Sequence, residues 1–358
     1  MNINRVRNSN WAAVPARQAL IGRHHRGWRI VLWIVVSMGV LLGIGAVYQV
    51  VRTAVDRNAY APPGQMIDMA GYKMHIYCLG EGSPTVILDH VGGSNSAQWA
   101  LIQPVLAAHT RVCAYDRPGF GWSEPSPDPQ DAAHNAQQLH ALLAKANITD
   151  PLVYVGHSFG GDVARVFAAN YPEDVVGLVL VDPGVSLHRP GVPEDVEAVW
   201  ESEDNSFMMM APTLARIGLL RLASYLGVMP GHGDLPSPQA EAFDAWQATN
   251  QFYDTLKAQQ LARYDTSAQV LAAEEQLGDL PMIVLSPSQP GQDAPKRQVW
   301  TEVNASIAAS SANGVHRVVI GTDHMGLAVK QEYAAVTAEA ILEMVAAVRG
   351  ERPLNLNQ

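Results

Sequence analysis

The chain has 358 residues, 48% of them hydrophobic and 16% charged, which suffices for one large domain, or one domain with an inserted subdomain, after any targeting segment. A formal net charge of −10 excludes the basic footprint of a nucleic-acid-binding protein, so nucleic acid is not expected as a partner. The two cysteines, Cys78 and Cys113, exclude a disulfide framework and have no metal-type spacing, so we expect buried free thiols, with a disulfide as the alternative if their strands are neighbours.

The first feature along the chain is an apolar segment, residues 30–51, without a charged side chain. At a rise of about 1.5 Å per residue, a helix of this length spans the hydrocarbon core of a bilayer. Trp28 and Trp33 at one end and Tyr48 at the other are typical of aromatic residues at a membrane interface. A cleaved signal peptide would have a shorter apolar region, of about 7–15 residues. A helix buried in a soluble domain is disfavoured because these 22 residues have no polar face to turn to water. We therefore predict an uncleaved signal anchor with a transmembrane helix at residues 30–51.

The charges around this segment predict its orientation. Residues 1–29 contain arginines but no Asp or Glu, and few cations follow the segment before residue 80. The positive-inside rule makes residues 1–29 a cytoplasmic tail and sends the rest of the chain across the membrane. An organelle presequence is an alternative for the first 27 residues, although the spanning segment would still follow. We expect a single-pass membrane protein with an extracytoplasmic domain, as on a bacterial inner membrane facing the periplasm or the exterior.

Beyond the membrane segment, residues 52–64 contain Pro62, Pro63 and Gly64 and predict a short linker. From residue 65 onward strands and helices alternate, which predicts a mostly parallel sheet with helices on both faces. The expected strands are residues 66–70, 73–79, 85–90, 111–115, 152–155, 175–181, 282–286 and 317–320. The expected helices are residues 99–108, 132–146, 162–170 and 331–349.

The most informative motif is Gly156-His157-Ser158-Phe159-Gly160, which stands between an apolar strand and an expected helix. This is the context of a nucleophile elbow, where a strained turn presents the serine hydroxyl at the top of the sheet. Glycine is expected at positions 156 and 160 because the crowded turn leaves no room for a Cβ atom. The alternative is an ordinary strand-to-helix turn in which Ser158 caps the helix.

Three other segments accompany this motif: the turn Asp116-Arg117-Pro118-Gly119-Phe120-Gly121-Trp122-Ser123, the strand end Val181-Asp182-Pro183, and the late Thr322-Asp323-His324. Together with the serine motif, they make the chain resemble the α/β-hydrolase fold superfamily over residues 65–350. Within that superfamily it is similar to bacterial hydrolases anchored by one membrane helix. The resemblance implies an α/β fold whose mostly parallel sheet has eight strands.

The same resemblance implies how the domain is divided. Residues 65–183 and 266–350 would form the hydrolase core, residues 184–265 a helical lid, and residues 351–358 a C-terminal tail. The expected lid is strongly apolar around Met208-Met209-Met210 and has no strand pattern. It would either form an apolar cleft for acyl or alkyl groups or simply pack against the core.

The resemblance also implies a catalytic triad in the chain order serine, acid, histidine. Ser158 would be the nucleophile, and His324, after the last expected strand, the base that takes its proton. The usual position of the acid is the loop after residues 282–286, which here departs from the common pattern and contains Asp293. Some family members carry the acid at the end of the previous strand, where Asp182 stands. We prefer Asp182 and keep Asp293 as the alternative.

An oxyanion hole needs two backbone N–H donors. Phe159, which follows the nucleophile, would supply one, and Gly92, in the loop after residues 85–90, would supply the other. Related enzymes often have His-Gly in this loop, where the chain has His90-Val91. The alternative is that Gly92 only forms a turn that links strand to helix.

These residues predict a membrane-anchored serine hydrolase that acts on a carboxylic ester or similar acyl substrate, which we expect to be a small, apolar molecule. Acyl transfer, peptide hydrolysis or carbon–carbon bond cleavage by the same triad are alternatives, because a fold does not define one reaction. A non-catalytic, membrane-tethered binding module is an alternative of another class. No metal or organic cofactor is expected, since no phosphate loop or ligand cluster is present in the sequence.

Overall fold

A computed structural model describes residues 16–194, 205–228, 231–288 and 294–355. Its centre is an eight-stranded sheet in the order β1-β2-β4-β3-β5-β6-β7-β8. β1 and β4 both pair with β2 in antiparallel fashion, and all other neighbours are parallel, so the expected mostly parallel sheet is confirmed. The strands are β1 (Gln65–Asp68), β2 (Lys73–Leu79), β3 (Thr85–Asp89), β4 (Val112–Tyr115), β5 (Leu152–His157), β6 (Val175–Val181), β7 (Met282–Ser288) and β8 (Gly314–Ile320).

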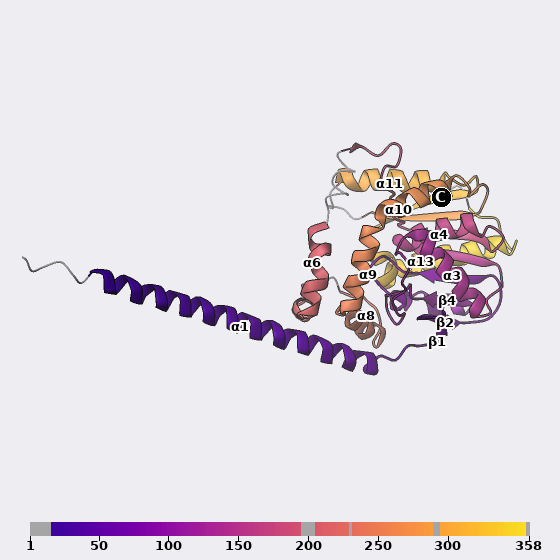
Figure 1. Ribbon diagram of the computed structural model, residues 1–358. Helices are drawn as coiled ribbons and strands as arrows, with labels where there is room; N and C mark the ends of the chain where they lie inside the picture. Colours follow the sequence, from indigo (N-terminus) through magenta and orange to yellow (C-terminus); the bar gives the residue numbers. More distant parts are fainter. Residues whose placement is uncertain (1–15, 195–204, 229–230, 289–293, 356–358) are drawn as a thin grey trace, which may run out of the picture.

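Helices cover both faces of this sheet (Figure 1). Successive side chains of a strand point to opposite faces, so Tyr154 of β5 packs in one core layer and Val153 and Val155 in the other. The first layer contains α3 (Ala132–Lys145), α4 (Phe159–Asn170), α10 (Arg263–Glu274) and α11 (Ala294–Ala308). The second layer contains a 3₁₀ turn (Ser96–Trp99), α2 (Gln103–Ala107), α12 (Gly326–Val329) and α13 (Gln331–Val348).

The insertion between β6 and β7 is helical in its described part, and we call residues 184–265 the lid. Its helices are α6 (Asn205–Arg216), α7 (Leu219–Tyr225), α8 (Gln239–Gln247) and α9 (Asn250–Leu261). α10 begins at Arg263, just inside the expected lid boundary, but packs against α3 and α4 of the core. The helix expected at residues 99–108 is instead divided into the 3₁₀ turn and α2, with Pro104 in the first turn of α2.

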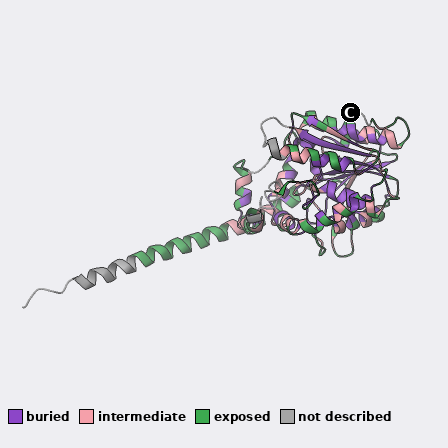
Figure 2. Cartoon of the chain, turned by 90° about the horizontal axis from the view of Figure 1, so that it is seen from above, coloured by how far each residue is buried: buried purple, intermediate pink, exposed green. Residues whose placement is uncertain are grey.

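The N-terminal helix α1 spans Ala16–Ala59 and therefore continues through most of the segment 52–64 that was expected to be a linker. That expectation is wrong up to Ala59, because residues 52–59 contain no glycine or proline and nothing breaks the helix before Pro62. Residues 27–59 are long and apolar enough to cross a membrane. Most of this part of α1 is exposed, in contrast to the buried core of the folded domain (Figure 2).

The two cysteines form a disulfide, so the expectation of free thiols is wrong. β2 and β4 are antiparallel neighbours, and their register places Cys78 directly opposite Cys113. Directly opposed residues of an antiparallel pair lie about 4.5–5.5 Å apart, which is within bridging distance. The two cysteines can form a disulfide because the strand order of the sheet makes β2 and β4 neighbours.

Candidate active site

Ser158 lies on a strained turn between β5 and α4. Its backbone angles, φ 55° and ψ −119°, belong to a region that residues other than glycine seldom adopt. The neighbouring glycines are sterically required: a Cβ on Gly156 would lie 2.2 Å from the carbonyl oxygen of Gly160, and one on Gly160 would lie 2.7 Å from that of Asp89. This turn has the local geometry that the sequence motif predicts, and Ser158 makes no capping bond with its side chain.

The structure brings Asp182 and His324 together. Asp182 follows β6, which neighbours β5, and His324 lies in the loop after β8, so both residues are at the carboxyl edge of the parallel strands. The Oδ2 atom of Asp182 is 2.6 Å from Nδ1 of His324. Asp182 is fully buried, whereas the His324 side chain is 30% exposed, which leaves the imidazole accessible to a reactant. Asp293, the alternative acid, lies outside the described residues.

The imidazole of His324 lies beside the serine turn. Its ring centroid is 4.7 Å from that of His157, the residue that precedes Ser158. His157 is itself buried and its Nδ1 is 3.1 Å from Nε2 of Gln98. Burial and the neighbouring His324 hold the pKa of His157 well below its usual value, so this imidazole stays neutral. Asp323, adjacent to His324 in sequence, instead accepts hydrogen bonds from the Gly326 backbone and Lys330.

Sequence reasoning missed the side chains that hold Asp182. Asn304 of α11 donates from Nδ2 to Oδ1 of Asp182 at 3.0 Å, and Nη1 of Arg297 lies 3.4 Å from Oδ2. Asn304 also donates to Ser286 of β7, whose hydroxyl is 2.8 Å from Nε2 of His316. His316 is therefore connected to Asp182 through the side chains of Ser286 and Asn304. The sequence analysis did not predict a helix at residues 294–308, and such a prediction would have been the one indication that Asn304 packs beside the sheet.

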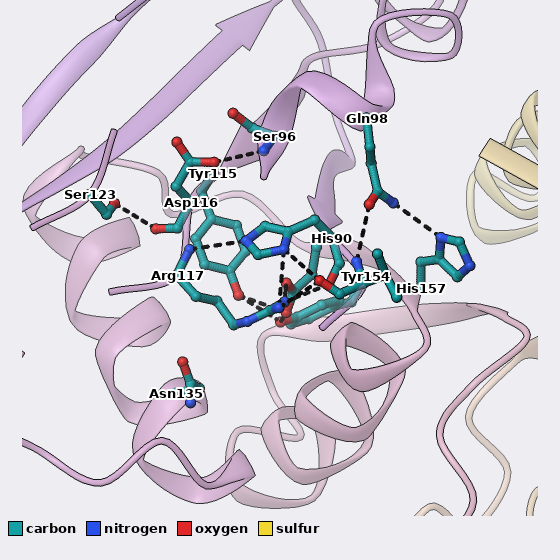
Figure 3. A network of polar contacts seen from close by, with 12 residues as sticks. His90, Ser96, Gln98, Tyr115, Asp116, Arg117, Ser123, Asn135, Tyr154 and His157 are labelled. Carbon is teal, nitrogen blue, oxygen red and sulfur yellow. Dashed lines mark hydrogen bonds and ion pairs between the residues drawn. The ribbon is translucent and has the colours of Figure 1, made fainter. Parts of the chain in front are cut away.

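The loop after β3 contains Gly92 and is held in place by Arg117. The guanidinium of Arg117 pairs with Asp89 and donates to the carbonyl oxygens of His90, at 2.6 Å, and Val91, at 3.0 Å. Figure 3 shows this network around His90, together with Tyr115 and Tyr154, whose hydroxyls donate to Asp89. Burial, followed by the nearby Arg117 charge, lowers the pKa of His90 to about 3.

The same loop approaches the start of α4. A Cβ atom on Gly92 would lie 3.5 Å from Cβ of Phe159, so the two residues expected to form the oxyanion hole are neighbours. Arg117 belongs to the turn at residues 116–123, and its guanidinium carbon also lies 5.1 Å from the ring centroid of Phe159. The network of Arg117 thus gives the turn a structural role: it fixes the backbone of the loop beside Ser158.

A cavity of about 370 Å³ lies next to Phe159, between the core and the lid. Its walls include Gly92, Asp162, Ser186 and Gln259, with Met208 of α6 and Trp300 of α11. Burial raises the pKa of Asp162 to about 6, with Arg165 acting in the opposite direction. A larger hollow, of about 830 Å³, lies between α1 and α9 and has neither Phe159 nor Gly92 in its wall, so the smaller cavity is the one that adjoins the two residues expected to form the oxyanion hole.

Comparisons with known proteins agree with this architecture. The model of the alpha/beta hydrolase fold family matches residues 84–305. The 2-hydroxy-6-oxo-2,4-heptadienoate hydrolase of Pseudomonas putida is 26% identical over 239 residues, which cover 62% of this chain and 84% of that protein. An uncharacterized protein of Schizosaccharomyces pombe is 31% identical over 159 residues, 36% of this chain and 29% of its own length, so the chain matches less than a third of that relative.

Solved structures have the same fold. An esterase from Exiguobacterium antarcticum superimposes with a TM-score of 0.56 at 17% identity. The superposition covers 78% of this chain and 99% of the esterase. At this identity the likeness concerns the fold.

Proposed function

Because the chain belongs to the α/β-hydrolase fold family, we propose that it is a membrane-anchored serine hydrolase that cleaves an ester or similar acyl substrate through an acyl-enzyme on Ser158. The observation that carries this proposal is the 2.6 Å contact between Asp182 and His324, beside the strained turn of Ser158. A buried carboxylate on one imidazole nitrogen leaves the other nitrogen free to act as a base.

In the first half of the reaction, Nε2 of His324 takes the proton of the Ser158 hydroxyl as Oγ bonds to the acyl carbon. The carbonyl oxygen becomes an oxyanion, which the backbone N–H groups of Phe159 and Gly92 would stabilise. His324 then gives its proton to the leaving alkoxide, and the acyl group stays on Ser158. Asp182 holds the Nδ1 proton throughout and stabilises the imidazolium.

In the second half, a water molecule gives a proton to His324 and its oxygen attacks the acyl carbon. The bond to Ser158 breaks, the serine takes the proton back, and the carboxylic acid leaves. The Arg117 network supports this step because it fixes the loop that carries Gly92, and preorganised donors lose little energy to reorganisation.

A fluorophosphonate probe tests the proposal. Wild-type protein should be labelled, Ser158→Ala should not, and Ser310→Ala, just after the end of α11, should be labelled like wild type. Labelling of Ser158→Ala, or no labelling of wild type, would contradict the proposal, and the second result would favour a non-catalytic binding module.

A second candidate is the hydrolysis of a carbon–carbon bond by the same triad, with acyl transfer and peptide hydrolysis as further uses of it. Two polar atoms of the cavity wall favour a polar substrate: Ser186 Oγ and Gln259 Oε1 are buried and have no hydrogen-bond partner within the described residues. The similarity to the Pseudomonas putida hydrolase agrees with this candidate. Turnover of 2-hydroxy-6-oxo-2,4-heptadienoate, compared with that of a p-nitrophenyl ester, separates the two reactions.

For the membrane, we propose that α1 crosses the bilayer once, with residues 1–29 in the cytoplasm and the hydrolase domain outside. The disulfide between Cys78 and Cys113 supports this side, because disulfides persist in oxidising compartments. Protease added to intact spheroplasts should digest the domain. A protected domain in intact spheroplasts that is digested after lysis would contradict this orientation.

A further inference from the structure

Lid helix α7 and the residues after it present an apolar face to solvent. Leu219, Leu222 and Leu226 recur at the spacing that places side chains on one face of a helix. With Tyr225 and Val228, these residues are 46–72% exposed. The charged residue of α7, Arg221, points inward and is 2% exposed. A continuous exposed apolar face of this kind marks an interaction surface.

This face is fixed to the membrane helix α1. Arg221 pairs with Asp56 of α1 at 2.6 Å and donates from Nε to Gln49 of α1 at 2.9 Å. The amide of Gln49 in turn donates to the carbonyl oxygen of Ala248 in the lid at 2.6 Å. All three polar side chains are buried, so the contact is specific and water is excluded from it. These contacts fix the position of the lid relative to α1, and through α1 relative to the membrane.

The position of the contact along α1 gives the depth of the lid. From Trp28 to Tyr48 a helix rises about 30 Å, the thickness of a hydrocarbon core. The turn between α6 and α7 touches α1 at Gly45, where a Cβ atom would lie 2.3 Å from the carbonyl oxygen of Ile217. Gly45 precedes Tyr48 by less than one turn, about 4.5 Å on the membrane side. Arg221 of α7 donates to Gln49, the residue that follows Tyr48, so α7 is level with the aromatic residue that marks the boundary.

We propose that the apolar face of α7, formed by Leu219, Leu222, Tyr225, Leu226 and Val228, lies in the headgroup–acyl boundary of the leaflet from which α1 emerges. Apolar faces with tyrosine and leucine bind at this depth. The inference rests on the proposed anchoring by α1 and not on the chemistry of Ser158. In Figure 1, α1 leaves the domain beside α8 and α6 and runs outward alone, so the lid is the part of the domain that faces the bilayer.

The position of the lid at the membrane indicates which class of substrate enters the cavity. Met208 of α6 and Leu256 and Gln259 of α9 form its lid-side wall. α6 packs against both α9 and α7, so α6 connects the wall of the cavity to the face of α7 that we place on lipid. The substrate would then be an acyl lipid taken from the leaflet rather than a molecule that diffuses in from water.

The experiment uses full-length protein reconstituted in phosphatidylcholine–phosphatidylglycerol vesicles. Leu222→Cys is labelled with bimane, and nitroxide-bearing acyl chains quench a probe that enters the boundary. The matched control is Ile320→Cys, because Ile320 is 76% exposed but belongs to β8, the edge strand of the sheet, rather than to the lid. The native thiols are joined in a disulfide and do not compete for the label.

We expect several-fold stronger quenching at Leu222 than at Ile320. Equal quenching at both positions, or excimer fluorescence from pyrene at Leu222, overturns the proposal, and the excimer would identify a second copy of the chain as the occupant. Flotation of the same vesicles reports anchoring: if the protein does not float with lipid, anchoring and the lid placement fail together. Fluorophosphonate labelling of the same sample reports the serine chemistry separately, so its failure alone leaves the lid placement standing.

Discussion

Replacing Asp182 with asparagine tests the acid of the triad by changing a single atom. In wild type, Oδ1 of Asp182 accepts from Asn304 and Oδ2 faces Nδ1 of His324. The Asn304 amide nitrogen can only donate at this position, so the side-chain oxygen of the introduced asparagine would stay on it and the new NH₂ group would face His324. Nδ1 would then have to accept, which moves the imidazole proton to Nε2, the nitrogen that must take the serine proton.

A neutral imidazole with its proton on the wrong nitrogen cannot act as the base. We therefore expect Asp182→Asn to lower kcat for a p-nitrophenyl ester by about 10⁴-fold, which corresponds to about 5.4 kcal/mol of transition-state stabilisation. The fluorophosphonate labelling rate should fall in parallel, while the thermal unfolding temperature should change little because the shape is retained. Asp293→Asn is the control and should keep wild-type turnover. Near-normal turnover of Asp182→Asn, with loss in Asp293→Asn, would refute the reasoning and transfer the role to Asp293.

Three further predictions concern the scaffold. The pKa of His90 is about 3 in the folded protein and about 6.5 in the unfolded chain, so the stabilisation that comes from this neutral imidazole is complete above pH 6.5 and is lost as the pH falls toward 3. At pH 5 the free energy of unfolding should be about 2 kcal/mol lower on this account, and the melting temperatures at pH 7.5 and pH 5 should differ less for His90→Asn than for wild type. Replacing Cys78 and Cys113 with serine opens a loop of 35 residues and should lower the free energy of unfolding by about 4 kcal/mol in a urea titration; a change below about 1 kcal/mol would contradict this stabilisation. Gly160→Ala places a Cβ 2.7 Å from a backbone oxygen and should abolish probe labelling, whereas Gly231→Ala, with open space around its Cβ, should not.

Much of the architecture could be predicted from local patterns. Apolar strand runs such as residues 175–181 alternate with helices, and this alternation predicts the parallel sheet without knowledge of the strand order. The turn at Ser158 was predictable from the motif because Gly156 and Gly160 stand at positions where a Cβ atom would clash with nearby backbone atoms. Position in the chain predicts His324 among the twelve histidines, and the structure places this residue at the same edge of the sheet as Ser158 and 2.6 Å from Asp182, while its role as the base stays a prediction.

Features that depend on packing could not be predicted in the same way. The disulfide depends on β2 and β4 being neighbours, and strand order is a tertiary property. Asn304 reaches Asp182 only because α11 packs against β7 and β8, and nothing in the residues around position 304 indicates a contact with Asp182. Likewise, the ion pair between Asp56 of α1 and Arg221 of the lid joins residues far apart in sequence, so the packing of the lid on α1 could not be predicted from either segment alone.

The central claim is that Ser158 carries the acyl group, and mass spectrometry of the probe adduct tests it most directly. Trypsin should release residues 146–165 as one peptide, in which Ser158 is the only serine. We predict that wild-type protein carries the phosphonyl mass on this peptide, at Ser158, and that His324→Ala acquires it far more slowly. An adduct on any other peptide, or equal labelling rates in the two proteins, would contradict the account.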